Sequence, residues 1–163
     1  MKIDLKQSLI INPIILGNWS HVKKGQRLIP KLRNSMKNFE FRQLSVNLKG
    51  NDFNDFNRRK EDTYLNCDIF LQISNSEGNS YATLDAMICG LPIVASNVGL
   101  FYKDVPENCF VKMDWEKNSD VDYVKSKIEE AWSKREELSK NCRKWYLDNC
   151  SFDGWSNTMK GLV

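Results

Sequence analysis

Two apolar runs of strand length, separated by a helical segment, constrain the fold of this chain more than any other feature. The runs occupy residues 68–74 and 92–96, and the first is rich in β-branched and aromatic residues. Between them, Ser80 is a plausible N-cap, residues 81–89 include good helix formers, and Gly90 is a stop signal. This order predicts two buried strands connected through a helix.

The start of that helix is a candidate phosphate site. A turn before a helix leaves backbone N–H groups without intrahelical partners, and these donors and the helix dipole favour an anion. Gly78 in the turn has no Cβ, so a ligand can approach the backbone closely. Glu77 can accept hydrogen bonds from sugar hydroxyls, whereas Asp85 lies about one and a half turns into the helix. The pattern predicts a sugar nucleotide lying across the helix N-terminus.

A second candidate motif lies upstream, at the end of another apolar run. Residues 14–17 are predicted to form a strand, and the loop after them ends in Lys24 and Gly25. A helix is expected over residues 26–36, because apolar residues recur near the helical period at Leu28, Ile29, Leu32 and Met36.

Strands and helices alternate along the rest of the chain. Residues 39–46 and 109–113 are predicted strands, and a long helix is expected over residues 121–147. Its predicted buried side consists of Val124, Ile128, Ala131, Trp132, Leu138 and Trp145. Such alternation predicts an α/β fold with a Rossmann-like, doubly wound parallel sheet, which binds ligands at the carboxyl ends of its strands. Both motifs, at residues 17–25 and 74–80, fall at such ends.

The two motifs resemble the signature of retaining GT-B glycosyltransferases of family 4, the glycosyl transferases group 1. That signature has a Glu, seven residues and a second Glu before a Gly-x-Pro strand entry. Glu77 matches the first acid and Asp85 replaces the second. Further matches are Lys24-Gly25, Ala86-Met87, Gly90, Pro92 and Val94-Ala95-Ser96. The resemblance covers nearly the whole chain and implies the C-terminal, donor-binding half of a GT-B enzyme.

The resemblance also implies a role for each site residue. Glu77 would position the donor sugar and Lys24 would neutralise the diphosphate, so these two are the predicted catalytic residues. The backbone amides of residues 79–81 would hold the distal phosphate, and Asp85 would bind the ribose. The predicted substrate-binding residues are Gly17, Asn18, Gly78, Asn79, Ser80, Tyr81 and Asp85. The family normally has an Arg where this chain has Asn18. No metal and no cofactor are expected, because cationic side chains and helix dipoles replace a metal in that family.

The function implied by the resemblance is transfer of a sugar from a nucleoside-diphosphate sugar to an acceptor hydroxyl, with retention at the anomeric carbon. Residues 1–163 are expected to form one nucleotide-sugar-binding domain, with the N-terminal acceptor domain absent. The expected partners are the sugar nucleotide, an acceptor glycan or other hydroxyl compound, and, as one option, a separate acceptor-domain chain.

Other interpretations stay open. An inactive nucleotide-sugar-binding or partner-docking module of the same fold is the alternative, and it predicts exposed apolar residues such as Trp19 or Phe101. A flavodoxin-like or receiver-type domain is a third, weaker hypothesis. Ser74 and Glu77 can instead form a capping box. Asp85 can be a solvated helix residue, and Lys24 can be an ordinary surface charge.

Composition excludes several functional classes. A net charge of +3, with basic residues scattered among acids, gives no nucleic-acid footprint. No apolar run approaches the roughly 20 residues of a transmembrane helix. The five cysteines show no C-x-x-C spacing, so we expect reduced thiols in a cytoplasmic protein. His21, the single histidine, has no visible relay partner and no close cysteine pair, so it is neither a predicted base nor a zinc ligand.

Overall fold

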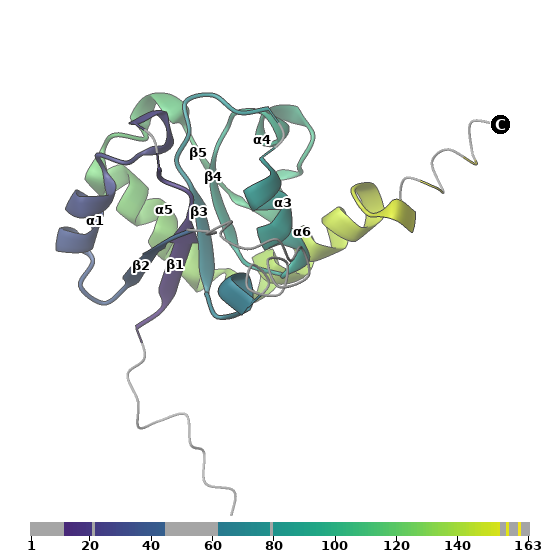
Figure 1. Ribbon diagram of the computed structural model, residues 1–163, viewed down its shortest axis with the longest axis horizontal. Helices are drawn as coiled ribbons and strands as arrows, with labels where there is room; N and C mark the ends of the chain where they lie inside the picture. Colours follow the sequence, from purple (N-terminus) through teal and green to yellow (C-terminus); the bar gives the residue numbers. More distant parts are fainter. Residues whose placement is uncertain are drawn as a thin grey trace, which may run out of the picture.

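A five-stranded parallel sheet forms the centre of the molecule (Figure 1). The computed structural model describes residues 12–20, 22–44, 62–78 and 80–153, together with residues 156 and 160. The strands are β1 (Ile14–Gly17), β2 (Glu40–Gln43), β3 (Ile69–Gln72), β4 (Ile93–Ser96) and β5 (Val111–Met113). They follow the order β2-β1-β3-β4-β5, and each neighbouring pair is parallel. The predicted α/β, Rossmann-like doubly wound sheet is confirmed.

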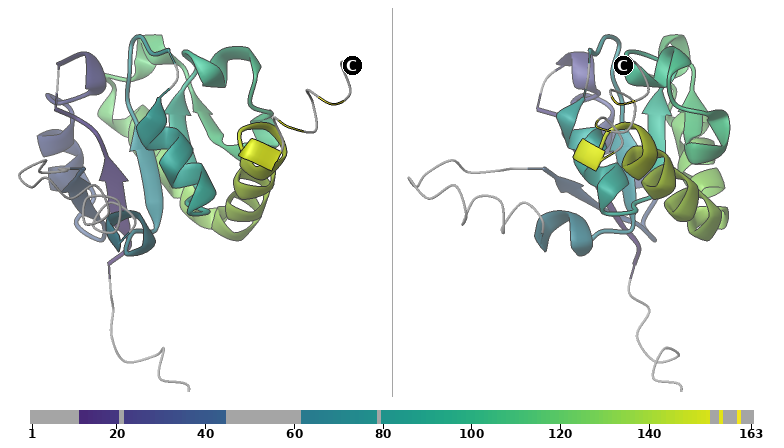
Figure 2. Two further views of the ribbon diagram at one scale, coloured as in Figure 1. Left: turned by 45° about the vertical axis from the view of Figure 1, so that its right-hand side comes forward. Right: turned by 90° about the vertical axis from the view of Figure 1, so that its right-hand side faces the viewer.

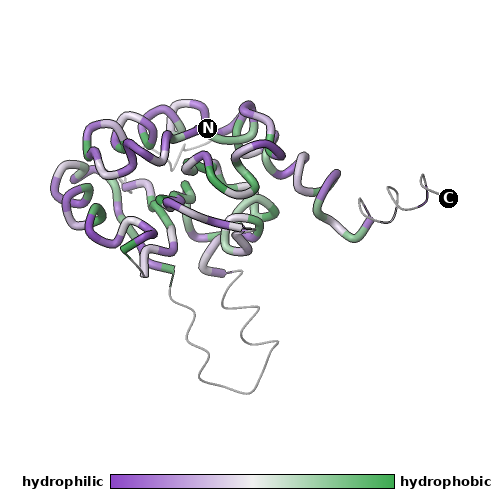
Figure 3. The backbone as a smooth tube through the Cα atoms, turned by 90° about the horizontal axis from the view of Figure 1, so that it is seen from above, coloured by the Kyte–Doolittle hydropathy of each residue, from purple (hydrophilic) through white to green (hydrophobic). Residues whose placement is uncertain are grey.

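Helices cover both faces of this sheet (Figure 1; Figure 2). The helices are α1 (Ile29–Ser35), α3 (Tyr81–Ile88), α4 (Leu100–Lys103), α5 (Val121–Ser133) and α6 (Arg135–Asn149), with 3-10 turns η2 (Val22–Lys24), η3 (Glu107–Cys109) and η4 (Trp115–Lys117). α1 and α5 pack on one face, while α3, α4 and most of α6 pack on the other. Hydrophilic residues are prominent along the outer helices (Figure 3), as expected for helices that bury only one side.

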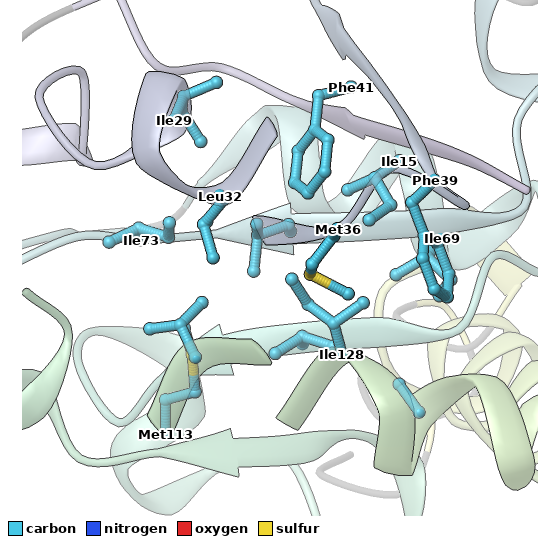
Figure 4. Close-up of a cluster of buried hydrophobic side chains, with 14 of the residues drawn as sticks. Ile15, Ile29, Leu32, Met36, Phe39, Phe41, Ile69, Ile73, Met113 and Ile128 are labelled. Carbon is cyan, nitrogen blue, oxygen red and sulfur yellow. The ribbon is translucent and has the colours of Figure 1, made fainter. Parts of the chain in front are cut away.

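Alternating side chains along the strands divide the interior into two cores. In β3, Ile69 and Leu71 belong to the core under α1 and α5, whereas Phe70 belongs to the core under α3. Figure 4 shows the first core, in which Leu32 from α1 and Ile128 from α5 are both fully buried. Burying an aliphatic side chain of this size contributes roughly 1.5–3 kcal/mol. These contacts hold the sheet and the loops at its carboxyl edge in place.

The prediction of one continuous helix over residues 121–147 is wrong, because the structure has two helices there. α5 ends at Ser133 and α6 begins at Arg135, with Lys134 between them at φ −102° and ψ 13°. The break allows the chain to pass from the core that contains Ile128 to the core that contains Cys142. Of the predicted buried side chains, Val124, Ile128, Ala131 and Leu138 are buried, whereas Trp132 and Trp145 are only partly buried.

Other predicted elements exist but have different bounds. The helix expected over residues 26–36 starts at Ile29, because Gly25 has a φ of +79° and residues 25–28 form a turn. Pro30 lies in the first turn of α1, where its fixed φ is compatible with a helix. The strand expected over residues 109–113 begins only at Val111, since Cys109 ends η3.

Candidate functional site

Two loops meet at the carboxyl edge of the sheet, one after β1 and one after β3. These strands pair directly, with Leu16 opposite Phe70, although more than fifty residues separate them in sequence. The two predicted motifs, at residues 17–25 and 74–80, therefore lie side by side at one edge of the sheet.

A small pocket lies between the two loops. Its lining includes four of the nine predicted site residues, and the lining residues are Asn18, Lys24, Phe70, Gln72, Ser74, Glu77, Ser80 and Ala82. Because it lies at the start of α3, the pocket is next to the N–H groups that a helix leaves without intrahelical partners. Backbone donors, a cation and a carboxylate are thus gathered in one place.

The two predicted catalytic residues contact each other directly. Lys24 Nζ lies 3.2 Å from Glu77 Oε1, and the side chains are 31% and 13% exposed. The Ser74 hydroxyl donates a hydrogen bond to the same oxygen, Glu77 Oε1, at 2.8 Å. The ammonium can bind a phosphate, while the carboxylate can accept hydrogen bonds from hydroxyl groups. The pair therefore offers complementary groups for the two halves of a sugar diphosphate.

The capping-box interpretation of Ser74 and Glu77 is wrong. In a capping box the Glu side chain would accept from the Ser74 N–H. That N–H instead donates to Ser96 Oγ at 3.1 Å, and the next helix begins only at Tyr81. The Glu77 carboxylate is left to face Lys24 in the pocket.

Backbone contacts join the two loops into one unit. The Asn75 N–H donates to the Lys23 carbonyl at 3.1 Å. Gly25 has a φ of +79° and packs closely on Ile73. A Cβ added to Gly25 would lie only 2.8 Å from the Ile73 side chain. A residue with a side chain would be strained there twice, by the backbone conformation and by this contact. Lys24 is consequently held in position by its neighbour Gly25.

Two further residues, Gly99 and Asn118, contact the backbone of the loop that contains Glu77. Gly99, after β4, has φ +57° and ψ −131°, and a Cβ on it would collide with the carbonyl oxygens of Glu77 and Gly78. The buried Asn118 amide donates to the Ser74 carbonyl at 3.4 Å and to Asn75 Oδ1 at 2.9 Å. Sequence reasoning missed Asn118, because nothing near it in the chain connects it to a loop more than forty residues away.

Some predicted site residues have structural roles of their own. A Cβ on Gly17 would meet the Leu71 carbonyl and the Trp19 ring, so this glycine provides space for protein atoms. Ser80 is the N-cap by position but makes no cap hydrogen bond with its side chain, which accepts from Thr83 Oγ1 at 2.8 Å.

The remaining predicted residues lie around the pocket. The Gly78 Cα faces open space, as a glycine approached by a ligand would. The Tyr81 side chain is 78% exposed. Asp85 lies in α3, outside the pocket lining and near Tyr64. Burial raises the pKa of the Tyr64 hydroxyl, and the nearby Asp85 carboxylate raises this pKa further. Asn79 and His21 fall outside the described residues.

The pocket also contains a polar side chain that sequence reasoning missed. Gln72, the last residue of β3, is only 6% exposed. Among the residues that the structure describes, neither its Oε1 nor its Nε2 has a hydrogen-bond partner. The signal in the sequence was a single amide within an otherwise apolar strand.

The docking interpretation made a prediction that is wrong. Trp19 and Phe101 were expected to be exposed, but each is 2% exposed. The Trp19 ring N–H donates to the Leu71 carbonyl at 3.1 Å, and the Phe101 ring packs at a tilt against Phe110 in the core under α3. Both residues therefore belong to the interior.

The described part of the chain offers neither a metal cluster nor a membrane-spanning helix. Within it, no three or more His, Cys, Asp or Glu side chains lie close enough together to hold a metal ion. The helices in the same part are all too short or too polar to cross a membrane.

Comparison with known proteins gives a family match over most of the chain. The family model described as glycosyl transferases group 1 matches residues 14–145. A search of the curated proteins finds no match.

Solved structures share the fold at low sequence identity. Sucrose-phosphate synthase from Thermosynechococcus elongatus matches with a TM-score of 0.69 and 16% identity, over 94% of this chain and 45% of that one. The C-terminal domain of a glycosyl transferase group 1 family protein (LpcC) from Francisella tularensis matches at 0.57 and 12% identity, over 86% of both chains. Alr3699/HepE from Anabaena, in complex with UDP and glucose, matches at 0.60 and 17% identity, over 88% of this chain and 46% of that one. The chain thus spans less than half the length of two of these proteins.

Proposed function

We propose a function from one premise: the chain belongs to the glycosyl transferases group 1 family, which is family 4 of the glycosyltransferases. Its five-stranded parallel sheet is one half of a GT-B fold and matches a C-terminal domain of that family. On this premise the chain binds a nucleoside-diphosphate sugar. It forms the donor side of a retaining enzyme that transfers the sugar to an acceptor hydroxyl.

The observation that supports this proposal most is the contact between Lys24 and Glu77 at the start of α3. A cation and the helix N-terminus together favour a diphosphate, and the adjacent carboxylate favours hydroxyl groups. A sugar nucleotide presents both kinds of group a few ångströms apart, and the family match favours it over other phosphorylated sugars.

Each side chain then has a role that follows from its position. The Lys24 ammonium stabilises negative charge on the nucleoside diphosphate as it departs. Glu77, held by Ser74, orients the donor sugar through its hydroxyls. The amides at the start of α3 hold the distal phosphate, and Asp85, further along the helix, binds the ribose.

A binding-only module is the second candidate function, and Asn18 favours it. Asn18 lines the pocket where the family has an Arg, which leaves Lys24 as the one cationic side chain among the described residues of the pocket lining. With a single cation, the leaving group is less stabilised, so donor binding without transfer is consistent with this pocket.

We further propose that residues 1–163 act as one donor-binding domain and that a second domain or a separate chain supplies the acceptor site. Relatives of about twice this length support this proposal, because the chain covers 45% and 46% of two of them. The acceptor is a glycan or another hydroxyl compound.

Calorimetric titration with UDP, GDP and ADP, and then with their glucose conjugates, tests the proposal. We expect one nucleotide series to bind. Lys24→Ala should weaken the diphosphate and the conjugate alike, by about 10- to 100-fold, because it removes a charged hydrogen-bond donor. Lys23→Ala is the matched control: it removes the same charge one residue away, in the same turn but outside the pocket lining, and should change little.

Glu77→Ala should weaken the sugar conjugate more than the free diphosphate. Absence of binding to every nucleotide, or equal losses for the two lysine variants, would refute the donor site. Turnover separates the two candidate functions, since an active enzyme releases the nucleoside diphosphate from a bound conjugate when an acceptor is present, whereas a binding module does not.

A further inference from the structure

We propose that Gln72 binds a hydroxyl group of the donor sugar and thereby helps to select the sugar. This inference rests on the proposed function. It begins from a buried carboxamide that has no hydrogen-bond partner among the described residues, in the same pocket as Lys24 and Glu77.

The position of Gln72 directs its side chain to the pocket. Gln72 is the last residue of β3 and lies opposite Ala95 in the register of the neighbouring strand. It shares a face of the sheet with Phe70, two residues earlier, and that face is the one covered by α3. Both Phe70 and Gln72 line the pocket, so the carboxamide lies between the sheet and the first turn of the helix.

An unpartnered amide in this place is costly. Burying a carboxamide without hydrogen bonds destabilises a protein, and the great majority of buried polar side chains have a partner. In the backbone, Gln72 pairs with Ala95 in the neighbouring strand β4, and its carbonyl accepts from Ser96 Oγ at 3.4 Å. Within the described residues the carboxamide makes no hydrogen bond that a leucine would lack, so we infer that a ligand group completes its hydrogen bonds.

The chemistry of a carboxamide identifies the part of the ligand. Oε1 accepts and Nε2 donates, so Gln72 needs a group that both donates and accepts. A phosphate only accepts, and it would leave Oε1 facing an anion. A sugar hydroxyl does both, and Glu77 in the same pocket is suited to neighbouring hydroxyls. Lys24 remains the group for the diphosphate.

The test uses Gln72→Met in the full chain, because methionine keeps the length of the side chain and removes both hydrogen-bonding atoms. UDP and UDP-glucose are the first probes, with GDP-glucose and ADP-glucose and their diphosphates if the wild type prefers them. We expect the variant to bind the glucose conjugate about tenfold more weakly and the free diphosphate unchanged. Gln26→Met, the same change at an exposed position, should alter neither.

Thermal unfolding without ligand is the second measurement, and it does not depend on binding. The Gln72→Met variant should unfold at the same or a higher temperature than the wild type. A lower unfolding temperature would mean that the amide has partners within the protein, and it would overturn the inference.

The binding results separate this inference from the proposed function. If the wild type binds none of the nucleotides or conjugates, both are overturned. If it binds and Gln72→Met binds the conjugate equally well, only the inference is overturned. An equal loss for the diphosphate and the conjugate would assign Gln72 to the nucleotide and likewise overturn its role in sugar selection.

Discussion

The substitution Gly99→Ala tests whether the close packing of Gly99 on the loop that contains Glu77 stabilises the fold. Gly99 has φ +57° and ψ −131°, a conformation that residues with a side chain rarely adopt, and its position is pressed against the carbonyls of Glu77 and Gly78. The backbone strain alone costs about 1–3 kcal/mol for an alanine. Displacing the two carbonyls adds to this, so we expect a total loss of about 2–4 kcal/mol in the free energy of unfolding.

Gly78→Ala is the matched control, because the two glycines lie against each other. Its φ is outside the left-handed region, and a Cβ there would meet nothing within 4 Å. We expect Gly78→Ala to change the free energy of unfolding by less than about 0.5 kcal/mol. Its effect should appear in nucleotide affinity, since the new methyl group occupies space that a ligand would approach.

Urea denaturation monitored by tryptophan fluorescence measures both variants, and thermal unfolding gives a second reading. For a chain of 163 residues, the loss at Gly99 corresponds to a decrease of about 6–12 °C in Tm. Equal stability of Gly99→Ala and the wild type would refute the argument that this glycine holds the loop. Equal losses at both glycines would show that the loop tolerates neither side chain, contrary to the open space at Gly78.

Three further predictions concern the thiols, the loop support and pH. Burial raises the pKa of the Cys142 thiol to about 12, so Ellman's reagent at pH 8 should label the exposed Cys150 and leave Cys142 unlabelled until denaturant is added. Asn118→Ala removes both hydrogen bonds to the Ser74–Asn75 turn and should lower the free energy of unfolding by about 1–3 kcal/mol; a neutral result in urea titration would show that the turn is held without it. A hydrogen bond from Lys134 holds the pKa of Glu130 below its ordinary 4.5. The folded chain therefore binds fewer protons at Glu130 than the unfolded chain does. The resulting stabilisation is present above pH 4.5 and is lost as the pH falls through the folded-state pKa. Glu130→Gln should therefore be less stable than the wild type at pH 7, by no more than about 1 kcal/mol, and equally stable at pH 2; the same difference at both pH values would contradict this.

Much of the fold could be predicted because its signals are local. Each signal specifies the structure of only the few residues around it. Examples are the apolar run around Phe70, the helix formers after Ser80 and the helix stop at Gly90. The break at Lys134 could not be predicted in this way. Both sides of it have helical patterns, and the break lies where the chain passes from α5, which packs on the first core, to α6, most of which packs on the second.

The candidate site shows the same division. Glu77 and Lys24 were singled out from the sequence, through strand ends, a helix start and a family signature. Their 3.2 Å contact was not, because it requires β1 to pair with β3, with β2 placed outside them. Gln72 was passed over as one polar residue in an apolar strand, since its lack of partners is a property of its surroundings.

The sequence by itself determined the class of fold, the strand ends at which we propose that a ligand binds, and the family to which the chain belongs. These follow from periodicity, from residues with special backbone preferences and from a motif, all of which are written in neighbouring positions. Only the tertiary structure decided that the two loops form one pocket, that Gly99 and Asn118 hold it, and that Gln72 is buried in it without a partner. Those contacts join residues far apart in the chain, and strand order and packing bring them together.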